Sequence, residues 1–397
     1  DVVLVQSDIS DRCMVSVGIL TGNHFPRVGG MEFATHFLAE QLNKLPGVNV
    51  GVACSTMPEI PSGFKYPYPC YRARSLSYAT PWLYKMNVRK MIREQEVNIL
   101  HGPMLHGGGY DALVLGRKFR LPVVAQSHGS DVQVVDEIGY GAWLYPDMQK
   151  KILKVIKEAD RIIAVSSINK QNIIDLGAQP DKVTVIHNGI QYSKIQEIPF
   201  VNLRSKYGLS DDDFLLITVG RNSPVKRMQL LFEALQMLKE FNKIKCICVG
   251  PLKDLKDLVK TFGIERQVVL TGPVPENLKD SIFPPYPELI NLYRSSDLYI
   301  TTSYVESFGM AALDALASGI PVLIGSRHGV RDVIRENQTG WVMDRETPEE
   351  LAEMIIQLYH DREKLKSSAT VIKDSVSWLT WEYVAGEMVK IYKDILE

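Results

Sequence analysis

One segment of the chain joins a strand, a loop and a helix and places two acids on them: Asp297-Leu-Tyr-Ile-Thr-Thr-Ser-Tyr-Val-Glu306-Ser-Phe-Gly309-Met-Ala-Ala-Leu-Asp314-Ala-Leu-Ala-Ser-Gly319. Its apolar beginning predicts a short buried strand over 297–301, and its Ala- and Leu-rich end predicts a helix over 308–318. Short apolar strands alternate with amphipathic helical stretches along most of the remaining chain. This alternation predicts an α/β fold, in which parallel sheets are covered by helices on both faces.

The strand–helix alternation runs through the chain twice, with an interruption near residues 191–209 that contains Pro199. A single hydrophobic core rarely grows beyond about 250–300 residues, and this chain has 397. We therefore predict two doubly wound, Rossmann-like sheets with a hinge in the interruption.

The composition is that of an ordinary globular protein, with 45% hydrophobic and 23% charged residues. The 45 Lys and Arg residues nearly balance the 46 Asp and Glu residues, which excludes the strongly basic surface of a general nucleic-acid binder. The five cysteines are scattered and favour a reducing compartment. No apolar run approaches the roughly 18–20 residues of a membrane-spanning helix, and no signal peptide opens the sequence, so we expect a cytoplasmic protein.

Ligands of open parallel sheets bind at the carboxyl ends of the strands, so the loops that follow strands are the candidate site. Glu306 lies just after a strand, and Gly309 lets the backbone and the helix amides approach an anion or a sugar oxygen. Asp314 falls in a helix of Ala and Leu, where a buried carboxylate needs a hydroxyl, amide or cation beside it. The alternative is structural, with Glu306 interacting with the helix dipole and Asp314 bonded locally.

Two further loops carry side chains suited to a nucleotide or a sugar. Arg221 and Lys226 follow a strand that ends in glycine, and a guanidinium with an ammonium suits a diphosphate, although a solvated basic turn would look the same. His128 follows the predicted strand over 123–126 and should reach into a cleft, oriented by Asp131. An ordinary packing histidine is the alternative at that position.

Glycines and acids elsewhere give weaker signals. Gly29-Gly30, just before the first long helix, offers a cradle of backbone amides. The run Gly107-Gly-Gly109 lacks the spacing of a dinucleotide-binding loop. The run Asp211-Asp-Asp213 looks like a metal-binding pair but precedes a strand instead of following one, so we predict a turn there.

Taken in order, these segments resemble the retaining glycosyltransferases of family 4, and the resemblance covers nearly the whole chain. That family has the GT-B fold, in which two Rossmann-like domains face a central cleft. The resemblance implies an N-terminal acceptor-binding domain over 1–195, a nucleotide-sugar-binding domain over 196–375, and a helix over 376–397 that crosses back to the first domain. The segments that carry it are Gly29-Gly30, His128-Gly-Ser-Asp131, Val185-Ile-His-Asn-Gly-Ile190, Gly220-Arg221 with Lys226, Gly250, Thr271-Gly-Pro-Val274, Glu306 with Asp314, and Ser377-Trp378 with Tyr392.

The resemblance implies transfer of a hexose-type sugar from a nucleotide-diphosphate sugar to a hydroxyl acceptor, with retention and without a metal or other cofactor. Arg221 and Lys226 would bind the diphosphate, Glu306 and His128 the transferred sugar, and Asp314 the ribose. Family frequency slightly favours UDP over GDP, and the acceptor class stays open among glycans, glycolipids and small molecules. The catalytic residues so implied are His128, Glu306, Arg221 and Lys226. The donor-binding residues so implied are Gly30, Arg221, Lys226, Val274, Glu306, Ser307, Phe308, Gly309, Met310 and Asp314.

Several positions depart from the family pattern near the donor. Asp314 stands where Glu is usual, the usual Gly-Gly-x-x-Glu appears as His328-Gly-Val-Arg-Asp332, and Gln191 replaces an Asp. Extra residues over 277–285 fall near the expected nucleobase pocket. Two other functions therefore stay open: another GT-B activity, such as a glycosyl phosphorylase or a sugar-nucleotide epimerase, and a catalytically silent subunit that binds sugar nucleotides.

The predicted helix over 82–93 mixes Trp82 and Met86 with several Lys and Arg residues. This mixture predicts a peripheral contact with the inner face of a membrane. An ordinary helix that covers the sheet explains the same residues.

Overall fold

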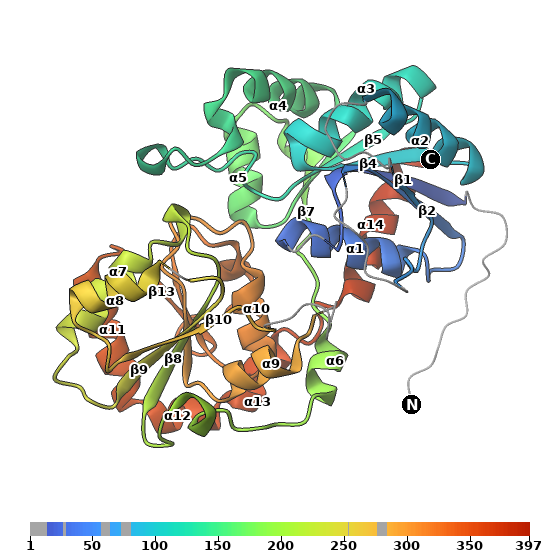
Figure 1. Ribbon diagram of the computed structural model, residues 1–397. Helices are drawn as coiled ribbons and strands as arrows, with labels where there is room; N and C mark the ends of the chain where they lie inside the picture. The colour runs from blue at the N-terminus through green and yellow to red at the C-terminus, as the bar shows by residue number, and fades with distance from the viewer. Residues whose placement is uncertain (1–13, 27–28, 57–63, 73–80, 253, 276–283) are drawn as a thin grey trace.

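The computed structural model describes residues 14–26, 29–56, 64–72, 81–252, 254–275 and 284–397. It contains two parallel β-sheets, each with helices on both faces (Figure 1). The predicted α/β fold class with two Rossmann-like sheets is therefore confirmed.

In the first sheet the chain adds strands on one side of the first strand and then continues on its other side. Such a reversal of strand order opens a crevice at the carboxyl ends of the strands, here between the first and fourth strands of the chain. In pairing order the strands are β3 (Cys70–Arg72), β2 (Val48–Thr56), β1 (Val15–Asn23), β4 (Ile99–Pro103), β5 (Val123–Ser127), β6 (Arg161–Ala164) and β7 (Val183–Val185).

Helices cover both faces of this sheet (Figure 1). One face carries α2 (Pro81–Glu94), α3 (Gly109–Phe119) and α4 (Pro146–Glu158), and the other carries α1 (Gly30–Leu42) and α14 (Trp381–Leu396). The helix α5 (Ser167–Asp175) follows β6, and α6 (Tyr192–Glu197) leads toward the second sheet.

The second sheet repeats this plan, with the reversal of strand order between β8 and β11. In pairing order its strands are β10 (Val268–Gly272), β9 (Ile244–Val249), β8 (Phe214–Val219), β11 (Leu298–Ile300), β12 (Val322–Gly325) and β13 (Gly340–Met343). One face carries α7 (Met228–Met237), α8 (Leu255–Phe262) and α11 (Pro348–His360). The other carries α9 (Pro287–Arg294), α10 (Met310–Ala317) and α13 (Ala369–Ser375), and α12 (Arg362–Ser367) connects α11 to α13.

A buried group of ion pairs fixes the amino end of this second sheet. The Asp297 carboxylate accepts hydrogen bonds from Arg204 at 2.7 Å and from Arg362 at 2.9 Å. Arg362 also donates to the backbone carbonyls of 211–213, so this acidic run is a turn before β8, as predicted. Among the described residues, no group of three or more His, Cys, Asp or Glu side chains could hold a metal ion.

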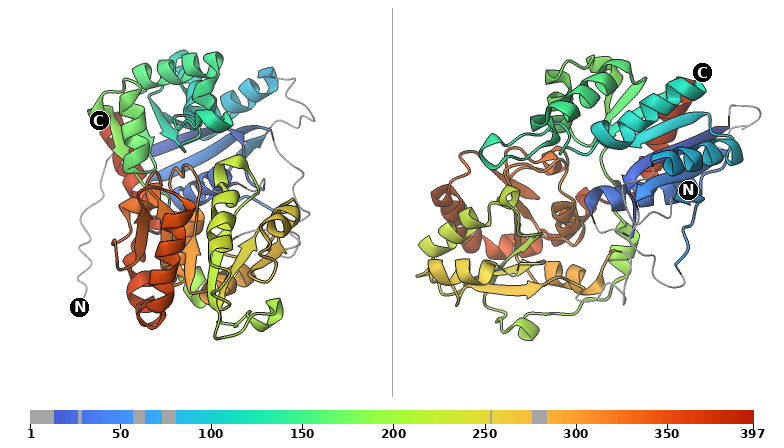
Figure 2. Two further views of the ribbon diagram at one scale, coloured as in Figure 1. Left: turned by 90° about the vertical axis from the view of Figure 1, so that its left-hand side faces the viewer. Right: turned by 45° about the horizontal axis from the view of Figure 1, so that its top comes forward.

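The helix α14 follows the second domain but packs against the first sheet, as Figures 1 and 2 show. The fully buried Tyr392 hydroxyl is hydrogen-bonded to His101 Nδ1 on β4 at 2.6 Å. Trp381 packs against Phe37 of α1, with ring centroids 6.0 Å apart. The helix therefore completes the core of the first domain, where the family resemblance implied that it would lie.

Two short edge strands and one helix were not predicted from the sequence. The edge strands β3 and β13 have three and four residues, which gives little hydrophobic alternation to detect. The helix α5 buries only Asn169 and Ile173 and has no apolar stripe to reveal it. In the part of the chain that the structure describes, no helix is both long and apolar enough to span a bilayer.

Candidate active site

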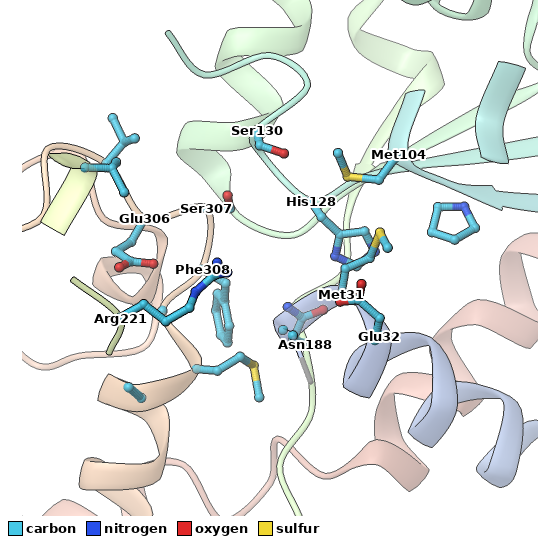
Figure 3. Close-up of a pocket in the computed structure, with 18 of the residues that line it drawn as sticks. Met31, Glu32, Met104, His128, Ser130, Asn188, Arg221, Glu306, Ser307 and Phe308 are labelled. Carbon is cyan, nitrogen blue, oxygen red and sulfur yellow. The ribbon is translucent and has the colours of Figure 1, made fainter. Parts of the chain in front are cut away.

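A cavity of about 610 Å³ lies between the carboxyl ends of the two sheets, and both domains line it. Its size is that of a typical small-molecule site. Figure 3 shows Arg221, Glu306 and Phe308 on one side and Met31, His128 and Asn188 on the other. Most of the predicted site residues meet in this cavity: Gly30, His128, Arg221, Lys226, Glu306, Ser307, Phe308, Gly309 and Met310.

Glu306 and Lys226 form an ion pair at the wall of the cavity. Ser303 Oγ donates a second hydrogen bond to the same carboxylate oxygen at 3.0 Å. Burial alone would raise the pKa of Glu306, but the nearby Lys226 and His328 outweigh it, so the pKa lies below its ordinary value. Glu306 is therefore an ionised carboxylate that is already paired with a cation before any ligand is bound.

Arg221 lies on the same wall and is exposed. The structure records no hydrogen bond or ion pair between its guanidinium and the other described residues. Tyr140 also lines the cavity, and burial raises the pKa of its phenol to about 12, although the positive charge of Arg221 acts to lower it. One cation of the predicted diphosphate pair is thus unengaged, and the other is held by Glu306.

The loop from Glu306 into α10 brings backbone amides to the cavity. Gly309 has a φ of 101°, in the left-handed region that favours glycine, and α10 begins at the next residue. The first amides of a helix have no acceptor within the helix and so can bind an anion. Phe308 is buried and stacks on His187 of the first domain, with ring centroids 5.2 Å apart, which fixes the position of the loop.

Gly30 begins α1 on the opposite wall, where a Cβ would meet nothing within 4 Å. The chain itself therefore does not require glycine there, and the open space lies on the cavity side. This is the room that a diphosphate approaching the backbone would need, although the role of Gly30 stays a prediction.

His128 presents a buried, unpaired ring nitrogen to the cavity. Its Nε2 has no hydrogen-bond partner, and the same holds for Nδ1 of His106 and of His328, which also line the cavity. Burial, with a smaller contribution from His101, lowers the pKa of His128 to about 3, so the ring is neutral near pH 7. Unpaired buried polar atoms are costly, and three around one cavity indicate that a polar ligand completes their hydrogen bonds.

Asp131 does not orient His128, and that prediction is wrong. The Asp131 carboxylate accepts hydrogen bonds from Ser127 Oγ at 2.7 Å, from the Gly129 amide at 3.0 Å and from the Leu105 amide at 2.9 Å. Its oxygens are occupied by the loop backbone, so Asp131 holds the loop that carries His128 instead of the ring itself.

Asp314 differs from expectation in two ways. It is not part of the cavity lining, and within the described chain no hydroxyl, amide or cation bonds its carboxylate, so the predicted partner is absent. Burial without such a partner raises its pKa to about 7. Asp314 lies on the second turn of α10, and its carboxyl group is half-ionised near neutral pH. It is therefore available to a ligand that extends past Met310.

Val274 lies outside the cavity and packs against the hydrophobic core. Most of the extra segment noted near the expected nucleobase pocket, residues 276–283, lies outside the described residues. The predicted contact between Val274 and the donor therefore stays a prediction.

Several lining residues were not singled out by the sequence reasoning. Asn188 belongs to the quoted 185–190 segment but had no assigned role, and His328 was noted only as a departure. His106 and Gly107 lie in a π-helical turn, Met104–Gly108, after β4. The glycine run there lacks dinucleotide spacing, but its position directly after a strand is the signal that points to these residues.

Family comparison agrees with this geometry. Residues 28–194 match the profile described as Glycosyltransferase Family 4, and residues 200–373 match Glycosyl transferases group 1. The chain belongs to this glycosyltransferase family. The first region contains the first sheet except β1, the second contains the whole second sheet, and residues of both line the cavity.

Two relatives of this chain carry different enzyme names. The D-inositol 3-phosphate glycosyltransferase of Thermobispora bispora is 28% identical over 258 residues, covering 62% of this chain and 58% of that enzyme. The chain thus matches little more than half of that relative's length. The alpha-monoglucosyldiacylglycerol synthase of Streptococcus pneumoniae is 25% identical over 345 residues, covering 82% of this chain and 74% of the synthase.

Solved structures confirm the GT-B fold. The sucrose-phosphate synthase of Thermosynechococcus elongatus has a TM-score of 0.80 at 17% identity, covering 96% of this chain and 99% of that one. Anabaena HepE, solved in complex with UDP-glucose, has a TM-score of 0.71 at 19% identity, with coverage of 96% and 99%.

Proposed function

We propose that this glycosyltransferase moves a hexose-type sugar from a nucleotide-diphosphate sugar to a hydroxyl acceptor, with retention of configuration and without a metal ion. The observation that carries the proposal is the shared cavity, in which Arg221, Lys226 and the amides before α10 face His128 across a space the size of a small ligand. A negatively charged diphosphate suits the first wall, and a polar sugar suits the second.

The cations supply what a metal supplies in other transferases. Negative charge grows on the diphosphate as the bond to the sugar breaks, and fixed positive groups at that point lower the barrier. Arg221 is free to bind the diphosphate, and Lys226 can turn from Glu306 toward it over a short distance. The amides of Phe308 and Gly309 add donors that need no reorganisation.

His128 and Glu306 would bind the transferred sugar. A histidine with a pKa of about 3 offers a neutral ring nitrogen to a sugar hydroxyl and does not act as a general acid. Glu306 would accept hydrogen bonds from sugar hydroxyls, and its pairing with Lys226 makes it a poor nucleophile. Retention then follows if the acceptor attacks the face from which the diphosphate leaves.

In this reaction the bond between the anomeric carbon and the diphosphate oxygen breaks, and the acceptor oxygen forms the new bond on the same face. The proton of the acceptor hydroxyl goes to the departing diphosphate oxygen. Closed domains exclude water, which favours transfer over hydrolysis.

UDP is the proposed nucleotide in preference to GDP. The solved HepE structures, which share the fold, are complexes with UDP and UDP-glucose. A carboxylate at Asp314 suits the ribose hydroxyls common to both nucleotides, so it does not itself discriminate between them.

We also propose that α2 contacts an anionic membrane surface on the inner face. The helix covers the sheet with Tyr84, Val88 and Met91, as the alternative reading expected, but Trp82 and Met86 remain 58% and 51% exposed. Lys85, Arg89, Lys90 and Arg93 surround them, which suits acidic lipid headgroups. Binding to vesicles with anionic lipid, absent for neutral vesicles at low salt, tests this contact.

A panel of nucleotide sugars tests the transferase proposal, with release of the nucleotide as the measurement. We expect release from a UDP-sugar that persists in EDTA and is lost in Glu306→Ala, with the anomeric configuration of the product retained by NMR. Nucleotide binding without release from any donor would favour the silent subunit, and phosphate-dependent release of sugar phosphate without nucleotide would favour a phosphorylase.

A further inference from the structure

The loop that carries Glu306 is hydrogen-bonded directly to the other domain. Ser166 Oγ of the first domain donates to the Ser307 carbonyl at 2.7 Å. Ser307 Oγ donates in turn to Gln133 Oε1 of the first domain at 3.0 Å. Ser166 and Gln133 are 0% and 3% exposed, so one partner of each bond is shielded from water. The residue next to the predicted sugar-binding acid is therefore held from both sides by groups outside its own domain.

Two glycines make this contact close. A Cβ on Gly129, the residue after His128, would overlap the Ser307 side chain. A Cβ on Gly329 would overlap both the Ser307 carbonyl and the Ser166 side chain. The His128 loop and the Glu306 loop thus touch each other, and Figure 3 shows Ser307 beside the loop that carries His128 and Ser130.

A third hydrogen bond joins the same parts of the two domains. The Ser167 amide donates to Asp332 Oδ2 at 2.6 Å. Ser167 is the first residue of α5, so its amide has no acceptor within the helix, and Asp332 supplies one. Asp332 ends the turn that begins at Gly329, whose amide bonds the Glu306 carbonyl at 2.9 Å. The three cross-domain bonds therefore involve Ser307, which follows Glu306, or Asp332, whose turn is bonded to the Glu306 carbonyl.

We propose that Gln133, Ser166 and Asp332 form a closure clasp that positions the Glu306 loop for transfer. This inference rests on the proposed transferase function. Gln133 and Ser166 contact Ser307, Asp332 contacts Ser167, and none of the three lines the cavity, so they are positioning residues. Each of these bonds joins one domain to the other, so a separation of the domains would break them and release the Glu306 loop.

The clasp separates two kinetic effects. Arg221, Lys226 and Asp314, the side chains proposed to bind the nucleotide, all belong to the second domain, so we expect nucleotide binding to depend little on the clasp. The chemical step requires Glu306 in its correct position, so this step depends on the clasp. Loss of one clasp bond should lower kcat about five- to tenfold, the usual net contribution of a buried hydrogen bond, and should change the Kd for UDP by less than about twofold.

Asp332 offers a matched pair of variants. Asp332→Ala removes the acceptor for the Ser167 amide, whereas Asp332→Asn keeps an acceptor oxygen of the same reach. We expect the kcat loss in Asp332→Ala and recovery of at least half of the wild-type kcat in Asp332→Asn, with the same UDP affinity by calorimetry in all three proteins. An unchanged kcat in Asp332→Ala, or a loss that Asp332→Asn does not recover, would overturn the role of Asp332.

The Ser307 contact is tested by a double-mutant cycle between Gln133→Leu and Ser307→Ala. If the pair acts as one bond, the double variant loses no more kcat than either single variant. Additive losses would overturn the contact as a positioning device, because each residue would then act independently of the other.

Amide hydrogen exchange of Ser167 provides a readout that does not depend on turnover. We expect this exchange to be slow in the wild type and faster in Asp332→Ala, both with and without UDP, because the carboxylate accepts the Ser167 amide hydrogen. If the wild type released no nucleotide from any donor, the proposed function would fail, while this exchange would still show whether the clasp holds the domains closed. Equal exchange in both proteins would refute the clasp itself.

Discussion

The wall that the second domain contributes to the cavity and the wall that the first domain contributes differ in how their polar groups are satisfied. On the second domain, Glu306 is paired with Lys226 and bonded by Ser303 before any ligand arrives. On the first domain, His106 and His128 keep unpaired buried nitrogens, and no Lys or Arg among the described residues lines that wall. Among the described residues, cations line only the wall of the second domain, whereas unpaired histidine nitrogens lie on both walls, with His328 on the second domain. Under the proposed function, the diphosphate meets its cations on one domain, and the sugar contacts both.

The largest expected effect comes from breaking the charged wall. Lys226→Ala should lower kcat on the order of 10²- to 10³-fold, as loss of a group that stabilises transition-state charge commonly does. The donor KM should rise as well, and the pKa of Glu306 should rise because its cation is gone. Steady-state kinetics with the best donor measure this. Lys243→Ala is the control, since Lys243 is half-exposed and lies 3.8 Å from Asp212 near the opposite end of the sheet. Equal losses in both variants would contradict the assignment.

The wall that the first domain contributes is tested through His128. His128→Ala should lower kcat about 10- to 100-fold, because the sugar loses one uncharged hydrogen-bond partner. The shape of the pH–rate profile between pH 5 and 8 should not change, because a group with a pKa of about 3 does not titrate in that range. The exposed His360→Ala variant serves as the control. A rate step near pH 6.5 that disappears in His128→Ala would show that the ring works as an acid or base.

The backbone of the loop from Glu306 into α10 is tested by two glycine substitutions that should change the free energy of unfolding in opposite directions. Gly309→Ala should destabilise the protein by about 1–2 kcal/mol, because an alanine is strained at a φ of 101°. Gly386→Ala, inside α14 and with nothing within 4 Å of its added Cβ, should stabilise it by about 0.5–1 kcal/mol. Denaturant unfolding of both variants measures the difference. A stabilised Gly309→Ala would mean that the loop takes another conformation in solution.

The smallest expected effect is the pH dependence of nucleotide binding through Asp314. If the ionised carboxylate binds the ribose, a pKa of about 7 makes UDP affinity rise roughly fourfold between pH 6.5 and 8. Asp314→Asn should bind UDP more weakly and show no such rise. Calorimetric titration at the two pH values measures this, and an equal rise in both proteins would assign it to another group.

The same carboxyl group affects stability in the ligand-free protein. Its ordinary pKa is 3.8 and its folded pKa is about 7, so between these values the folded state keeps a proton that the unfolded state has released. Stability therefore falls as the pH rises from about 4 to about 7. Asp314→Asn should remove this fall, which thermal unfolding at pH 5 and pH 8 would detect.

Sequence patterns predicted the part of this site that depends on sheet geometry. Parallel strands place their carboxyl ends together, so Glu306, Arg221 and His128, each just after a strand, had to approach one another within or between sheets. Patterns failed where the partner is distant in sequence or absent. The bond between Gln133 and Ser307 joins positions 174 residues apart. Nothing local distinguishes Asp131 as a support for backbone from Asp131 as an orienting acid, and helix composition alone does not reveal that Asp314 lacks a partner.

The return of α14 to the first sheet has a consequence for how the protein is made. The hydrogen bond between His101 and Tyr392 spans 291 residues, and the ribosome synthesises the whole second domain before α14 emerges. Domains usually fold in the order of their synthesis. Here the first domain cannot complete its core until α14 has been synthesised, and α14 follows the second domain in the chain. The later domain can finish folding first, and until α14 docks, the apolar face of α1 that Trp381 covers remains open to chaperones or to neighbouring chains.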